Sequence, residues 1–282
     1  MFEAILRAAL GFAVSLAAAS CELEQLTGPV DPAEVTITLA TTGGIVGVDY
    51  AIRVEGDSGK VRGVRCANGC EFSDGELLLP VSGAQVAMLA GALDRAGVLE
   101  SGNRDFGTEC CDIFHYDLTY ERGDRTVRIQ GTDTLFPEDL AAAIRLLQPL
   151  ASRTLSLIVA QSSSPEDWPT EPFSLGAVSF DGTTIRADVS YGGGCADHRM
   201  DLVIWGGWME SFPVQVNALI THDGGDDPCD SVVSETRTFD VFPLAVAYAE
   251  AYGTGGDARP RVILRIWDPE TGQPGRTLEV DL

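Results

Sequence analysis

The sequence is poor in basic residues, and lysine is almost absent from it. Among its 282 residues, 19 are lysine or arginine and 42 are aspartate or glutamate, and Lys60 is the single lysine. The formal net charge of -23 repels phosphate backbones and anionic lipid headgroups through long-range electrostatics. We therefore expect no nucleic-acid partner.

The N-terminal apolar run, from Ala8 to Ala19, is shorter than the roughly 20 residues that a membrane-spanning helix needs. Arg7 precedes this run and small residues follow it, which is the order of a secretory signal. The junction Ala-Ala-Ser-Cys that ends at Cys21 resembles the lipobox of bacterial lipoproteins, in which the cysteine takes the lipid. We expect a signal peptide over residues 1–20 and lipidation of Cys21; an ordinary cleaved signal with an incidental Cys21 is the alternative.

A lipidated Cys21 would place the protein in the cell envelope or at the cell surface, outside the cytoplasmic membrane. The membrane is then a partner only through the N-terminal lipid, because several acyl chains give stable anchoring without a spanning helix. Residues 21–34 are polar, acidic and contain proline, as is typical of a tether between a lipid and a folded domain.

Familiar catalytic motifs are also missing from the sequence. It has no G-x-S-x-G elbow and no H-E-x-x-H, and the run "GGIVG" at 43–47 lacks the lysine and following helix of a phosphate-binding loop. The acidic run "DGGDDPCD" at 223–230 lacks the ligand order of an EF-hand, so we interpret it as a solvated loop. We expect a protein that is not an enzyme and needs no cofactor.

Hydrophobic periodicity predicts an α+β N-terminal domain over residues 35–160, with antiparallel strands and two helices. Alternating apolar residues predict strands at 35–39 and 48–55, and Ser82 followed by Gln85 predicts a capped helix over 82–96. The pattern then predicts two further strands between 114 and 129 and a second helix that starts at Pro137.

Residues 161–173, rich in serine, proline and acids, predict a linker between two domains. Seven short alternating runs between residues 175 and 281, separated by Gly, Asp and Pro, then predict a mainly β C-terminal domain over 174–282. It would be an antiparallel sheet or sandwich with one short helix ending near Gly253.

Seven cysteines, less a lipidated Cys21, leave an even six, which in an exported protein predicts disulfides. Cys195 and Cys229 stand alone in the second domain, and we expect a bridge between them with His198 and His222 hydrogen-bonding beside it. The alternative is a zinc or copper site in which all four residues are ligands, making the protein a metal-binding protein or metalloenzyme.

The first domain holds Cys66, Cys70, Cys110 and Cys111. Neighbouring residues of a strand point to opposite faces, so Cys110 and Cys111 should reach different partners. This favours two links to Cys66 and Cys70. A local Cys66–Cys70 bridge remains open and would leave a strained vicinal bond between Cys110 and Cys111.

The first domain resembles the emfourins, small bacterial inhibitors of thermolysin-like metalloproteases. The resemblance lies in "TTGGIVGVDY" at 41–50, the helix after Ser82, the strand "DIFHYDLTY" and the helix "PEDLAAAIRLL". It implies a small α+β fold, a secreted metalloprotease as protein partner, and a contact region at Gly43, Gly44 and Gly47. The second domain resembles a module of uncharacterised secreted bacterial lipoproteins through "SYGGGCADH" and "PVQVNALITHD", which implies no activity.

Overall fold

The computed structural model describes residues 29–44, 47–66, 70–73, 75–109, 113–253, 260–268 and 270–282. The predicted signal peptide, Cys21, Cys110 and Cys111 lie outside the described residues. The chain divides into the units Met1–Asp31 and Pro32–Leu282, so the expected division into two folded domains at the linker is not confirmed.

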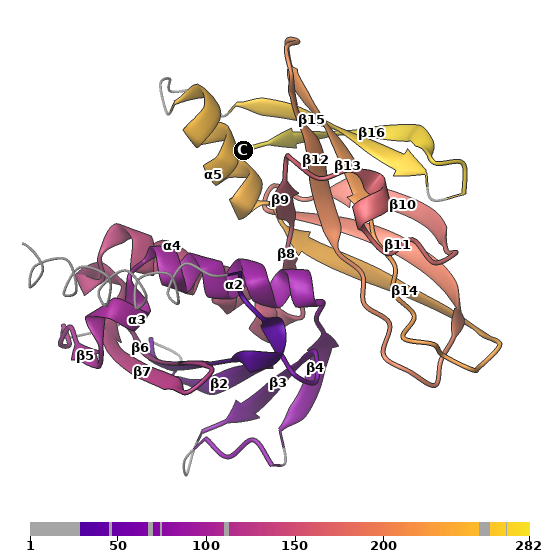
Figure 1. Cartoon of the computed structure of the whole chain (residues 1–282). Helices are drawn as coiled ribbons and strands as arrows, with labels where there is room; N and C mark the ends of the chain where they lie inside the picture. The colour runs from indigo at the N-terminus through magenta and orange to yellow at the C-terminus, as the bar shows by residue number, and fades with distance from the viewer. Residues whose placement is uncertain are drawn as a thin grey trace, which may run out of the picture. The chain divides into compact units, whose positions relative to one another are not determined.

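The N-terminal half of the larger unit is built on a seven-stranded sheet in the order β4-β3-β2-β1-β6-β7-β5 (Figure 1). All neighbours are antiparallel except β5 and β7. The strands are β1 (Val35–Gly43), β2 (Val48–Glu55), β3 (Lys60–Arg65), β4 (Glu76–Pro80), β5 (Arg104–Asp105), β6 (Phe114–Arg122) and β7 (Arg125–Thr132). The predicted alternation is confirmed in β1, where Val35, Ile37 and Leu39 are buried and the residues between them are less so.

Two helices pack against each other in this half, α2 (Gly83–Arg95) and α4 (Glu138–Leu147), and α3 (Val98–Ser101) follows α2. The predicted cap of α2 is confirmed, because the side chain of Ser82 accepts a hydrogen bond from N of Gln85. The buried faces of α2 and α4 form the core together with the sheet. Their buried apolar residues include Val86, Leu89, Leu93, Leu140, Ile144 and Leu147. The short 3-10 turns are η1 (Pro32–Glu34), η2 (Asp133–Leu135), η3 (Gln148–Ser152) and η4 (Pro165–Asp167).

Two sheets form the C-terminal half, in the orders β10-β11-β14-β8 and β16-β15-β13-β12-β9. The seven strands expected after the linker are all present: β10 (Ser174–Phe180), β11 (Thr184–Gly193), β12 (Leu202–Met209), β13 (Val214–Ile220), β14 (Ser231–Asp240), β15 (Arg261–Asp268) and β16 (Gln273–Asp281). The expected helix is α5 (Phe242–Tyr252). The chain is thus mostly β.

The sheets of the C-terminal half are mixed rather than antiparallel, which corrects the expectation from the sequence. β8 (Leu155–Ser156) lies parallel to β14, β9 (Ile158–Ala160) lies parallel to β12, and β13 lies parallel to β15. Residues 155–160, assigned from the sequence to the first domain, therefore complete both sheets of the second half. Sequence periodicity cannot show this, since the pairing partners lie some 45 to 85 residues away along the chain.

Side-chain contacts connect the two halves within the larger unit. Gln85 of α2 donates to the backbone carbonyl of Ser156 in β8, and Arg145 of α4 pairs with Asp240 of β14 at 2.6 Å. Lys60 pairs with Asp197 at 3.1 Å. Among the described residues, no helix has the length and apolarity needed to span a membrane.

Candidate functional site

A disulfide between Cys195 and Cys229 holds together the loop that follows β11 and the loop that precedes β14. The two strands pair antiparallel, with Gly193 opposite Ser231, so each cysteine lies two residues beyond the same end of the ladder. Their Cα atoms are 5.8 Å apart, within the usual range for a bridge. We call these loops, residues 194–200 and 221–230 with the facing Glu171, the loop cluster.

The structure does not form the alternative metal site from Cys195, His198, His222 and Cys229. The two sulfur atoms are bonded to each other, and a metal would need them as thiolates. Cys195, Asp227 and Cys229 do place potential ligand atoms within 4.8 Å of one another, but the same disulfide removes both sulfurs from that set.

The favoured pairing of Cys66 and Cys70 with Cys110 and Cys111 is not what the structure has. Cys66 is bonded to Cys70, with Cα atoms 4.5 Å apart, which is the local alternative. The argument for the other pairing assumed that Cys110 and Cys111 belong to a strand. The described strand β6 starts at Phe114, and Cys110 and Cys111 themselves lie outside the described residues.

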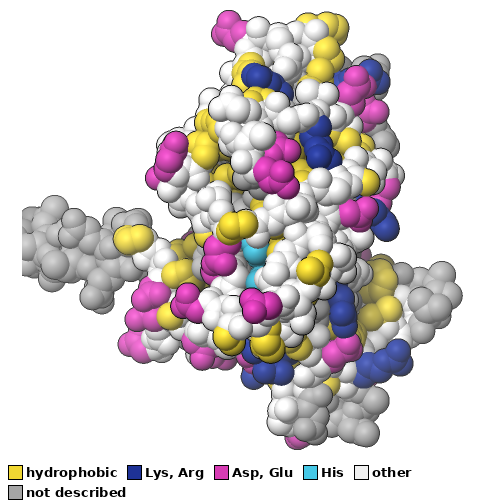
Figure 2. Space-filling model, turned by 90° about the vertical axis from the view of Figure 1, so that its right-hand side faces the viewer, with side chains coloured by type: hydrophobic (Ala, Val, Ile, Leu, Met, Phe, Trp, Pro, Cys, Tyr) yellow, Lys and Arg dark blue, Asp and Glu magenta, His cyan; other side chains and the backbone are white. Residues whose placement is uncertain are grey.

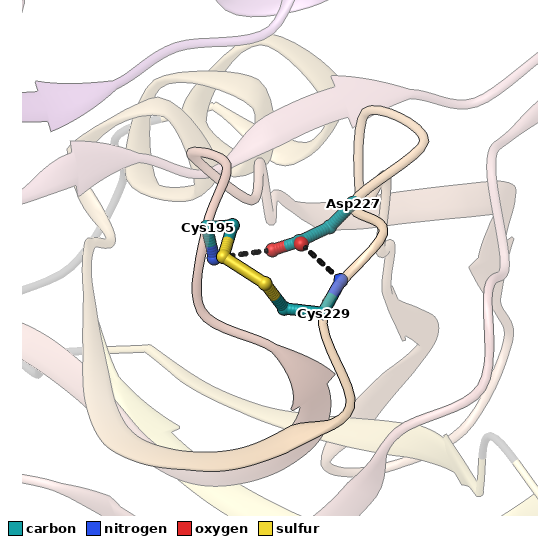
Figure 3. A group of neighbouring side chains, drawn as sticks. All are labelled: Cys195, Asp227 and Cys229. Atoms are coloured by element: carbon teal, nitrogen blue, oxygen red, sulfur yellow. Dashed lines mark hydrogen bonds between the residues drawn. A yellow bond between two sulfur atoms is a disulfide. The ribbon is translucent and has the colours of Figure 1, made fainter.

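Asp227 is the central acceptor of the loop cluster (Figure 3). Its Oδ2 accepts backbone N–H bonds from Gly194, Cys195 and Ala196 at 2.7–2.9 Å, and its Oδ1 accepts one from Cys229 at 2.9 Å. These backbone donors, Ala196 first, hold the pKa of the Asp227 carboxyl well below its usual range. The carboxylate therefore fixes the two loops that the disulfide joins.

The two histidines form a row of contacts that starts at Asp227. Nε2 of His198 lies 3.1 Å from Oδ2 of Asp227, and Nδ1 of His198 lies 2.8 Å from Nε2 of His222. Nδ1 of His222 lies 3.1 Å from the backbone carbonyl of Glu171. Every ring nitrogen of the pair thus has a partner inside the protein, and both residues are buried, with 3% and 2% of their surface exposed.

The ring of Tyr191 and the backbone of Gly193 pack directly against His198. Tyr191 stacks on His198 with ring centroids 4.4 Å apart, and its hydroxyl donates to Glu235. Gly193 has φ +145°, and a Cβ atom there would lie 2.5 Å from Nε2 of His198.

The sequence predicted a solvated loop at residues 223–230 and gave no role to Asp227. The available signal was the run of three glycines at 192–194, because glycine permits such close contact.

The predicted contact region around Gly43, Gly44 and Gly47 lies where β1 turns toward β2. N of Gly44 donates to the carbonyl of Ile113 at 3.1 Å, and N of Gly47 donates to the carbonyl of Gly44 at 3.0 Å. Gly43 has φ +103°, and a Cβ there would lie 2.4 Å from the carbonyl oxygen of Ile113. Close contact of Gly43 with the Ile113 backbone and of Gly44 with the Phe114 ring therefore explains the glycine pair.

A mainly apolar pocket of about 400 Å³ opens beside this turn. Gln148 donates to the hydroxyl of Tyr116 on its wall at 2.7 Å, and Phe114 on its wall has 37% of its surface exposed. Ligand pockets of this size are usually apolar with a few polar groups. The lining comes from β1, β2, β6 and η3: Leu39, Thr41, Val48, Tyr50, Ile52, Phe114, Tyr116, Gln148, Ala151 and Ser152.

A buried acid lies where the loop cluster meets α2. Asp201 has 3% of its surface exposed, and burial raises its pKa to about 6, although hydrogen bonds from Ser82 and Gln85 and the charge of Arg237 act in the opposite direction. Its Oδ1 has no hydrogen-bond partner, and neither has Oε1 of Gln85. A proton on Asp201 reduces the cost of burying this carboxyl.

Acidic side chains are spread widely over the face shown in Figure 2, with basic ones between them. On the described part of that face, the basic side chains do not gather into a continuous patch.

Comparisons with known proteins find similarity only among solved structures. No model of a protein family matches the sequence, and no curated protein matches it. The emfourin resemblance is therefore not confirmed by these comparisons and rests on the residues that carry it.

The matching solved structures include several proteins from Bacteroides. A "putative lipoprotein" of Bacteroides fragilis has 11% identity and a TM-score of 0.32, over 64% of this chain and 87% of that one. A NigD-like immunity protein of Bacteroides caccae has 13% identity and a TM-score of 0.29, over 88% of this chain and 91% of that one. At such TM-scores the likeness establishes neither a common fold nor a common function.

Proposed function

We propose that this protein is an exported, lipid-anchored binding protein without catalytic activity, and that its N-terminal half engages a secreted metalloprotease. The observation that supports a binding role is the open, mainly apolar pocket beside the turn at Gly43, Gly44 and Gly47. The emfourin resemblance supports a protease as the partner, since it points to the same turn.

The chemistry of the pocket favours binding over catalysis. Its described lining offers hydroxyl and amide groups but no carboxylate, imidazole or thiol that could act as acid, base or nucleophile. In the loop cluster, every ring nitrogen of His198 and His222 is hydrogen-bonded within the protein. The sulfur atoms of Cys195 and Cys229 are bonded to each other. The residues with the most reactive side chains thus hold the loops together.

An inhibition assay tests this function. The soluble protein, starting after Cys21, is added to a thermolysin-like protease while cleavage of a peptide is followed. We expect inhibition at micromolar concentration or below. No inhibition at that concentration would contradict a protease of this class as the partner.

A pair of phenylalanine variants tests the proposed surface. Phe114→Ala removes a partly exposed wall of the pocket and should weaken inhibition roughly tenfold or more, the loss expected of about 1.4 kcal/mol or more at a binding hot spot. Phe212→Ala is the matched control, because Phe212 is fully exposed between β12 and β13 and does not line the pocket. Equal inhibition by the two variants would place the contact elsewhere.

A further inference from the structure

The row of contacts through His198 and His222 has two ends that only accept hydrogen bonds. At one end is the backbone carbonyl of Glu171, which has no hydrogen to give. At the other is the carboxylate of Asp227, whose backbone donors keep its pKa low and the group ionised at neutral pH. Nδ1 of His222 and Nε2 of His198 must therefore each carry a hydrogen.

The contact between the two rings needs a hydrogen of its own. Nδ1 of His198 and Nε2 of His222 are 2.8 Å apart, which is a hydrogen-bond distance, and two bare nitrogen lone pairs would repel each other there. The three hydrogen bonds of the row therefore need three hydrogens, shared among the four ring nitrogens of the two histidines. Two neutral imidazole rings carry only two.

We infer that the His198–His222 pair is a buried proton-binding site, which holds one proton more than two neutral rings and carries a positive charge opposite Asp227. The site that binds this proton consists of residues from three segments, around Glu171, His198 and His222. Asp227 is its counter-ion. In the contact between His198 and Asp227, only 2% and 3% of the surfaces of the two side chains are exposed.

The charge belongs on His198 rather than on His222. Burial lowers the pKa of His222, and the neighbouring His198 lowers it further, so His222 stays neutral and accepts at Nε2. His198 is the ring that touches the carboxylate. Tyr191 also stacks on His198, and the face of an aromatic ring attracts a cation.

The surrounding charges favour a cation at this place. Oε1 of Glu171 accepts from N of Gly224, and the same carboxylate lies beside the His198 ring across that glycine. Acidic groups outnumber basic ones around the pair. Besides Asp227, the charged groups on the elements packed against the pair include the acids Glu171, Asp197, Asp201, Asp223, Asp226, Asp230 and Glu235 and the bases Lys60, Arg199 and Arg237.

The bound proton connects the segments of the loop cluster to one another. Without it, one of the three buried hydrogen bonds is lost, and an unpaired buried polar group is costly.

Nuclear magnetic resonance of the protein labelled with 15N-histidine counts these hydrogens directly. The chain has only three histidines, and a His115→Gln variant identifies the signals of the third. At pH 7 we expect hydrogens on both nitrogens of His198 and on Nδ1 alone of His222. A spectrum with one hydrogen on each ring would overturn the inference.

An asparagine variant tests the counter-ion. Asp227→Asn removes the negative charge and should abolish the doubly protonated pattern of His198 at pH 7. The control is Asp226→Asn, an exposed neighbour with φ +57°, a conformation that asparagine tolerates. An unchanged His198 pattern in Asp227→Asn would refute Asp227 as the counter-ion. The spectrum of the unaltered protein decides the proton count even if Asp227→Asn does not fold.

Discussion

At the scale of single residues, the loop cluster depends on a glycine that leaves room for a histidine ring. Gly193 has φ +145° and lies against His198 and Asp227, whereas a Cβ added at Gly192 would meet nothing within 4 Å. Position 192 therefore has room for a side chain and position 193 does not, although the sequence does not distinguish the two glycines.

We expect Gly193→Ala to destabilise the protein by roughly 1–3 kcal/mol, the usual cost of overpacking a buried site. Gly192→Ala should leave the free energy of unfolding almost unchanged. Urea denaturation of both variants measures the difference. Similar stability of the two would contradict the close approach of Gly193 to His198.

Asp201 should make the stability of the protein depend on pH, because its pKa is raised to about 6 in the folded state. The folded protein then binds a proton that the unfolded chain, with an aspartate pKa near 3.9, has already released. The stability contributed by this proton is complete below about pH 4 and is lost as the pH rises through about 6.

Asp201→Asn should remove this part of the pH dependence, on the order of 2–3 kcal/mol between pH 4 and pH 7. Denaturant unfolding at several pH values, compared with Asp226→Asn, isolates the effect from the general charge of the protein. An identical pH profile in the two variants would show that Asp201 does not titrate in this range.

At the scale of elements, the disulfide between Cys195 and Cys229 closes a long loop between two paired strands. The cysteines are 34 residues apart and the bridge restricts the unfolded chain. Replacing both by serine should cost roughly 3–4 kcal/mol by the chain-entropy account.

Thermal unfolding of the double serine variant and of the parent protein with and without a chelator measures this contribution. The variant should melt at a lower temperature, and the chelator should leave the parent unchanged. A chelator-sensitive parent that also carries about one metal ion per chain by elemental analysis would favour the metal site over the disulfide.

At the scale of the whole molecule, the net charge of -23 and the proposed N-terminal lipid act in opposite directions at a membrane. The charge repels an anionic surface, so the lipid has to supply the attachment. Cys21 precedes the folded unit Pro32–Leu282. Attachment and folding should therefore be separable.

Cys21→Ser should release the protein from the membrane fraction and leave its melting temperature unchanged. Fractionation of cells that produce the two forms, with immunodetection, checks the prediction. Continued sedimentation of the variant with membranes would contradict lipidation at Cys21.

The sequence alone located many of the strands and the start of one helix, because local structure depends on residues close together in the chain, but it did not locate β3 and β4. Alternating apolar residues located β1, β2 and the seven strands from β10 to β16, and Ser82 with Gln85 located the start of α2. The isolation of Cys195 and Cys229 in the second half likewise pointed to the bridge that the structure contains.

Only the tertiary structure decided what depends on contacts between distant segments. It assigned β8 and β9 to the sheets of the second half. It also brought Asp227 onto the loop after β11 and joined His198 to His222. Hydrophobic periodicity carries no information on such pairings, because the partner of a hydrogen bond or a strand is set by how the whole chain packs.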